Sequence, residues 1–180
     1  MMAKSTPWKI TLNRLLYFMI ALIGIFFLLV PISIFPNNLI SPEIIFVVTL
    51  VLIIRNPDYV PFWLIGIVFL LSDILLTQPL GLNTFVILLI TEFLRRNRLN
   101  FMEMLFFSEW LNIALLLLTA GFMRELLLIA TLSEHMPTLT IISKVGLSIF
   151  IYPILVGLVN IIFRVRKAHK NTSYSLGPNT

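Results

Sequence analysis

Asp73 is the residue of this chain best suited to chemistry, because it is a carboxylate inside an apolar run, residues 66–81. An acidic side chain at the centre of a membrane helix costs about 2.5–3.5 kcal/mol by insertion scales. Three roles offset such a cost: hydrogen bonding to nearby groups, contact with water near the membrane surface, or service as a proton or substrate site. We favour the first role because of the residues that follow Asp73.

The chain leaves Asp73 through Thr77 and Gln78, and the sequence predicts that a new helix begins at Pro79. The first amides of a helix have no partner within that helix. We therefore predict that Asp73 accepts hydrogen bonds from this helix start, or from Thr77 or Gln78, and so locks two helices into a hairpin. Gly81 is expected to permit the close approach.

Two other acidic residues have simple structural explanations. Glu43 falls in the first turn of a predicted helix, where a carboxylate favours the positive end of the helix dipole; a substrate role is the alternative. Glu92 is spaced to pair with Arg95 or Arg96 on one helix face, with a relay role as the alternative.

Glu109 and Lys144 are charges at membrane depth, which usually pair or face a cavity. Glu109 could pair with Asn112, one helical turn later, or with a residue on another helix. A structural role and a functional role for Glu109 are equally open. Lys144 is expected near the same end of the molecule as Glu125, and these two residues form a plausible ion pair.

Catalytic and metal-binding patterns are missing from the sequence. The absence of cysteine excludes disulfides, thiolate catalysis and cysteine-ligated metals. The two histidines, His135 and His169, have no metal-ligand spacing around them. We find no glycine-rich phosphate loop, no paired acidic motif and no His-x-x-x-Asp motif, so we predict no catalytic, cofactor or metal site.

Composition places the chain in a membrane. Of its 180 residues, 59% are hydrophobic and 12% are charged, whereas soluble proteins have roughly 45–50% and about 25%. We predict an all-α polytopic membrane protein. A net charge of +5 could indicate binding to nucleic acid. The basic residues, however, lie beside apolar spans, where they set the orientation of the protein in the membrane. We therefore expect no nucleic-acid partner.

Six transmembrane helices are predicted, over residues 15–34, 42–54, 60–76, 79–94, a part of 101–132, and 139–163. The segment 101–132 is too long for one span. It either starts with an interfacial piece at 101–107 or breaks near Gly121. Residues 1–163 are expected to form one domain, and the basic tail 164–180 is expected to be disordered.

Local signals mark several helix ends. Ser41 can cap the second helix, and Pro42 suits its first position. Arg55 and Pro57 belong to a tight turn after that helix. Pro153 is expected to kink the last helix.

The basic residues also predict topology. In the six-helix arrangement, 11 of the 13 lysines and arginines fall on one side, which the positive-inside rule assigns to the cytoplasm together with both termini. Five spans would divide the two basic ends between opposite sides, which we consider the weaker arrangement.

These features together resemble the MreD family of bacterial rod-shape-determining proteins. The resemblance is strongest over residues 42–96. It rests on Pro42, the Arg55-Asn56-Pro57 turn, Gly66, Asp73, the Pro79-Leu80-Gly81 turn, and Tyr152-Pro153 before a basic exit.

The resemblance implies a non-enzymatic scaffold in the bacterial inner membrane that supports cell shape and lateral peptidoglycan synthesis. Its partners would be MreC, MreB, RodA, a class B penicillin-binding transpeptidase and membrane lipid. The resemblance also implies a fold similar to the six-helix substrate-binding subunits of vitamin uptake transporters, which by itself assigns no substrate.

Three functions therefore compete. The scaffold would bind single helices of its partners laterally, with small residues admitting close contact: Gly24, Gly66, Ala114, Gly121, Gly146 and Gly157. A solute-binding transporter subunit would need an outward polar cavity, lined by Asp73, Glu125 and Lys144. A lipid-modifying enzyme is the third and least supported.

Overall fold

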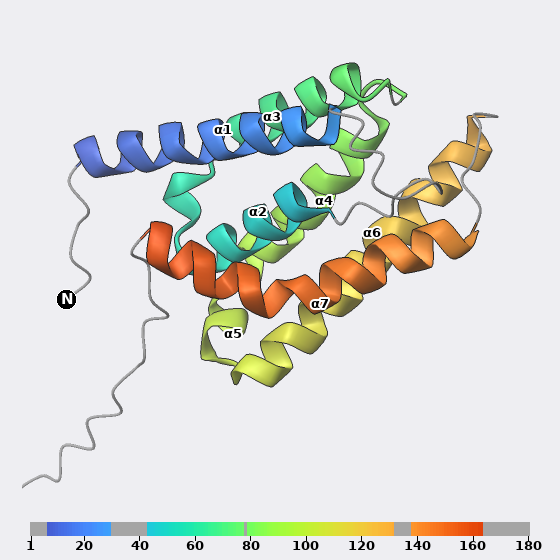
Figure 1. The fold of residues 1–180 in the computed structure, drawn as a ribbon. Helices are drawn as coiled ribbons and strands as arrows, with labels where there is room; N and C mark the ends of the chain where they lie inside the picture. The colour runs from blue at the N-terminus through green and yellow to red at the C-terminus, as the bar shows by residue number, and fades with distance from the viewer. Residues whose placement is uncertain (1–6, 30–42, 78, 132–137, 164–180) are drawn as a thin grey trace, which may run out of the picture.

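The computed structural model describes residues 7–29, 43–77, 79–131 and 138–163, and of Pro7 and residues 138–141 only the backbone. Within these ranges every regular element is a helix (Figure 1). The elements are α1 (Pro7–Leu29), α2 (Ile44–Arg55), η1 (Pro57–Tyr59), α3 (Phe62–Leu75), α4 (Leu82–Arg96), α5 (Arg98–Glu103), α6 (Phe106–Ala130) and α7 (Thr138–Ile162).

The long helices run alternately between two ends of one bundle (Figure 1). Helices α1, α3 and α6 run one way, and α2, α4 and α7 return. We call one end the Asp73 end, where α3 stops and α4 starts. We call the other the Arg55 end, where α2 stops; there Phe163, just after α7, stacks on Tyr59 of η1 with ring centroids 6.4 Å apart.

Helix α2 is the centre of the bundle. Every residue from Phe46 to Arg55 is buried, and the helix contacts α1, α4, α5 and α7. Its sequence is apolar on all sides, which is typical of a helix enclosed by others. Its 12 residues measure only about 18 Å, so it is shorter than the hydrocarbon core of a bilayer.

Three helices among the described residues are long and apolar enough to cross a membrane. Their candidate membrane spans are Trp8–Leu29, Phe106–Ala130 and Ile142–Ile162. Helices α2 and α3 are apolar but shorter. Many large apolar side chains on the outside are exposed, including Phe122, Phe150 and Ile161. The protein is therefore an all-helical membrane protein whose outer surface suits lipid.

Several predicted boundaries are corrected by the structure. Helix α1 begins at Pro7, eight residues before the predicted start of the span at 15, so the segment with Lys9 and Arg14 is also helical. Proline is favoured at the first position of a helix. Helix α4 begins at Leu82, three residues after Pro79, because Pro79 to Gly81 form a turn. Ser41, Pro42 and the tail 164–180 lie outside the described residues.

The long segment 101–132 divides at Met104 and Leu105, where the backbone is extended. The interfacial alternative is therefore the closer one, although the short helix α5 already starts at Arg98. Helix α6 runs without a break through Gly121, and α7 likewise continues through Pro153.

Gly24 admits a close contact between helices within the bundle. A Cβ atom there would lie 3.1 Å from Cγ1 of Ile45, so α1 and α2 approach closely. At Gly66, Gly146 and Gly157 a Cβ atom would meet nothing within 4 Å. These three glycines therefore admit no close contact inside the described chain.

Candidate functional site

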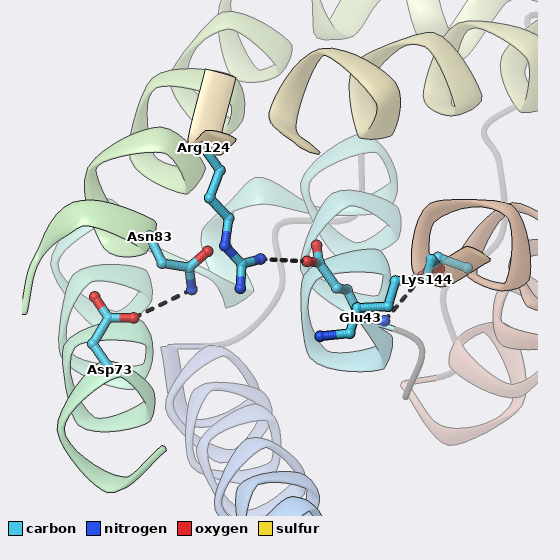
Figure 2. A network of polar contacts seen from close by, with 6 residues as sticks. Glu43, Asp73, Asn83, Arg124 and Lys144 are labelled. Carbon is cyan, nitrogen blue, oxygen red and sulfur yellow. Dashed lines mark hydrogen bonds and ion pairs between the residues drawn. The ribbon is translucent and has the colours of Figure 1, made fainter. Parts of the chain in front are cut away.

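Asp73 is fully buried and accepts four hydrogen bonds from the beginning of α4. Its Oδ2 accepts from the amide of Gly81 (3.1 Å), from the amide of Thr84 (3.2 Å) and from the Thr84 hydroxyl (2.8 Å). Its Oδ1 accepts from the side-chain amide of Asn83 at 3.2 Å, as Figure 2 shows. The predicted hydrogen bonding between Asp73 and this helix start is confirmed.

The local chain explains why α4 needs this carboxylate. Its N-cap is Gly81, which has no side chain to accept from the third residue of the helix, Thr84. Asp73 of α3 supplies the missing capping group from a different helix. Thr77 does not serve in this way, because its hydroxyl donates to the Leu76 carbonyl, and Gln78 lies outside the described residues.

The predicted reason for Gly81 is wrong. A Cβ atom at Gly81 would meet nothing within 4 Å, so close approach does not require glycine. Its backbone instead has φ of +81°, in the left-handed region that glycine adopts without a Cβ penalty. Conformation, rather than space, selects glycine here.

A second polar group at the Asp73 end joins α2, α6 and α7. Arg124 of α6 pairs with Glu43 at 2.7 Å (Figure 2). The Glu43 amide donates to the Ser148 hydroxyl of α7 at 2.9 Å. The sequence did not predict this ion pair. Glu43 is the N-cap residue of α2, without a side-chain capping bond, rather than a first-turn residue. Lys144 lies within electrostatic range of Glu43, Glu125 and Arg124.

A cavity of about 210 Å³ opens beside these charges. Its described polar lining comprises Glu43, Ser72, Asn83, Arg124 and Lys144. We predicted that Asp73, Glu125 and Lys144 would line such a cavity. Lys144 does line it, whereas Asp73 and Glu125 do not. Asp73 is absent because its oxygens face the start of α4.

The third polar group is a buried triad of Arg55, Glu109 and Tyr152. The Oε1 atom of Glu109 accepts from the guanidinium of Arg55 at 3.1 Å and from the Tyr152 hydroxyl at 2.8 Å. The side chains of Arg55 and Glu109 are 4% and 0% exposed. The partner of Glu109 is thus on another helix; Asn112 donates instead to the Ser108 carbonyl.

Basic side chains from several helices converge at the Arg55 end. Arg98 donates to the carbonyls of Ile54 and Arg55, each at 3.1 Å, and so caps the end of α2. Arg95 donates to Val60 at 2.6 Å, and Arg14 to Asp58 at 2.9 Å, both through backbone carbonyls. Cations at this position complement the negative end of the α2 dipole.

The Arg98 guanidinium is partly buried, which lowers its pKa from the usual value, while the nearby Asp58 carboxylate opposes that shift. A guanidinium remains charged despite such a shift. At the same end, the predicted pairing of Glu92 is confirmed, because Arg96 binds it at 2.9 Å.

No family model, curated protein or solved structure matches this chain. The candidate sites of this chain are therefore interpreted from its own geometry. Within the described residues, no group of three His, Cys, Asp or Glu side chains is arranged to hold a metal ion.

Several of the residues that carry the resemblance lie at the two ends of the bundle. Pro57 opens η1, and Asp73 and Gly81 form the interhelical cap. Sequence reasoning did not pair Arg55 with Glu109 or assign Tyr152 to them. A usable signal existed: an arginine closes one apolar run, and an acid and a tyrosine interrupt two others.

Proposed function

We propose that this protein is a scaffold of the MreD type in the bacterial inner membrane. In this role it binds MreC and, with MreB, RodA and a class B penicillin-binding transpeptidase, supports rod shape. The observation that carries the proposal is the Asp73 cap. The run 66–81 carries much of the resemblance, and its carboxylate accepts four hydrogen bonds from three residues at the start of α4, which supports a structural rather than a reactive use.

The proposal includes six membrane-crossing helices with both termini in the cytoplasm. Its support is the alternation of the helices and the charge difference between the two ends. Arg14, Arg55, Arg95 and Arg98 gather at the Arg55 end, whereas Arg124 and Lys144 lie at the Asp73 end. By the positive-inside rule the Arg55 end faces the cytoplasm.

The proposed docking surface for a partner helix is one face of α7. On this face, large exposed side chains alternate with two glycines and a proline. The large residues are Phe150, Ile154, Leu158 and Ile161, and the others are Gly146, Pro153 and Gly157. The two glycines leave open space, and small residues let membrane helices approach closely. We therefore expect a single transmembrane helix to lie along this face.

The test is depletion of the protein in its own cell. Rod-shaped cells should become round, and a plasmid copy should restore them. In that background, Ile154→Trp should weaken co-purification with MreC and impair rod shape. Leu115→Trp on α6 is the matched control, since the two side chains are 64% and 62% exposed. Unchanged shape on depletion, with loss of uptake of a vitamin, would overturn the scaffold.

A second candidate function is the solute-binding subunit of a transporter. The observation that favours it is the polar cavity of about 210 Å³ with Arg124 and Lys144 in its lining. This function requires vitamin-like solute binding by the purified protein and an ATPase partner.

A further inference from the structure

The polar cavity at the Asp73 end adjoins an apolar groove. The groove has a volume of about 360 Å³ and lies between α1 and α2. Leu28, Ile44 and Ile45 line both spaces, so one continues into the other. The polar cavity alone is below the roughly 300–1,000 Å³ of ligand pockets, and the groove falls within that range. A molecule with a compact charged group and a hydrocarbon chain would fit these spaces, with the charged group in the cavity and the chain in the groove.

The groove suits hydrocarbon rather than water. Its lining is aliphatic or aromatic, and its polar group, the Tyr17 hydroxyl, is engaged with the Thr49 hydroxyl at 2.8 Å. A cavity needs polar partners to hold ordered water. The side chains of Ile23 and Phe27 at its edge are exposed, so the groove is open sideways to the lipid.

The cavity suits an anion. Its described ionisable lining has two cations, Arg124 and Lys144, and one carboxylate, Glu43. Glu125 is within electrostatic range of Lys144 but does not line the cavity. The first turn of α2 lines the same space, and the positive end of a helix dipole favours negative charge. Ser72 and Asn83 add neutral polar groups.

We propose that the two spaces form a binding site for an acyl-chain lipid with an anionic phosphate headgroup. The headgroup occupies the cavity beside Arg124 and Lys144, and one chain lies in the groove between α1 and α2. Charge complementarity and the continuity of the two spaces select this occupant over a neutral lipid or a free anion. The site does not depend on the scaffold function.

The experiment uses the full chain, purified in a neutral detergent, with bound lipid counted by native mass spectrometry. We expect one phosphatidylglycerol per protein, held about tenfold more tightly than phosphatidylcholine, a difference of about 1.4 kcal/mol. Equal retention of both lipids would overturn the proposal. Glycerol phosphate competing as well as phosphatidylglycerol would also overturn it, because the site would then bind a free anion.

Two matched pairs of variants test the two halves of the site. Lys144→Gln should remove most of the preference for phosphatidylglycerol, whereas Arg96→Gln, outside the cavity, should retain it. Leu28→Trp should obstruct the junction and reduce retention of the lipid. Leu29→Trp is its control, as the side chain is similarly exposed and lines neither space. If both members of each pair behave alike, the lipid binds elsewhere. The preference of the unmodified protein decides the proposal even if a variant fails to fold.

Discussion

The carboxylate of Glu109 on α6 lies 3.1 Å from the guanidinium of Arg55 at the end of α2, and both side chains are enclosed by protein. The Tyr152 hydroxyl of α7 donates to the same carboxylate oxygen. One acidic atom therefore joins three helices that are far apart in the sequence. Burying such a pair is expensive, and removing one partner leaves an uncompensated buried charge.

Removing one partner of this pair should destabilise the protein strongly. Glu109→Gln leaves Arg55 charged and buried, which typically costs 3–5 kcal/mol. The measurement is the free energy of unfolding in detergent. Glu92→Gln is the matched control, because its pair with Arg96 is exposed and such pairs contribute about 0.3–0.5 kcal/mol. Equal losses in both variants would contradict a special role for the triad.

Asp73→Asn should destabilise the hairpin of α3 and α4. The substitution replaces one acceptor oxygen with an NH₂ group, which cannot accept a hydrogen bond from the donors at the start of α4. Hydrogen bonds to charged groups contribute about 1.5–3 kcal/mol each. We expect a loss in that range or above, measured by thermal unfolding, with faster hydrogen exchange at Gly81 and Thr84. Asp58→Asn, at an exposed residue, should change little. Unaltered exchange at both amides would show that the carboxylate is not the cap.

Gly81 and Gly66 should respond oppositely to the same substitution. Gly81→Ala places a Cβ on a backbone with φ of +81°, which costs about 1–2 kcal/mol. Gly66→Ala adds a methyl group to the interior of α3, where nothing lies within 4 Å, and should stabilise the helix by about 0.5–1 kcal/mol. Unfolding midpoints measured side by side check both signs. A larger loss at Gly66 would mean that a neighbour occupies its open side.

Arg98→Lys should weaken the Arg55 end although charge is preserved. An ammonium group cannot reproduce the planar fork that reaches the carbonyls of both Ile54 and Arg55. We expect a loss of about 1–3 kcal/mol in unfolding free energy. Arg96→Lys, at an exposed residue of α4, is the control and should be nearly silent. Similar values for the two variants would argue against capping by Arg98.

Much of the helical framework was predictable because apolar composition is a local property. Continuous apolar runs predicted α2, α3 and α7 within a few residues, and the turn at Pro57 was predicted from proline itself. Boundaries failed where the local signal was ambiguous. Pro79 resembles a first helical residue, yet the left-handed Gly81 delays the start of α4 to Leu82.

The pairing of charges was less predictable because it depends on distances between helices. The sequence indicated that Asp73 needed donors, and the donors were only 8 to 11 residues away. Glu43 and Arg124 are 81 residues apart, so their pairing required the tertiary fold to bring α6 near the residue that precedes α2. A single sequence contains no comparable signal over that separation.

The sequence by itself determined that this is an all-helical membrane protein and that its basic residues divide unequally. It also favoured Asp73 as the cap of a following helix. Hydropathy, charge and short-range capping all depend on residues near one another. Only the tertiary structure decided that α2 is enclosed, that Arg55 joins Glu109 and Tyr152, and that a polar cavity adjoins an apolar groove. Those features arise where several helices meet, and their geometry is fixed by packing rather than by any one segment.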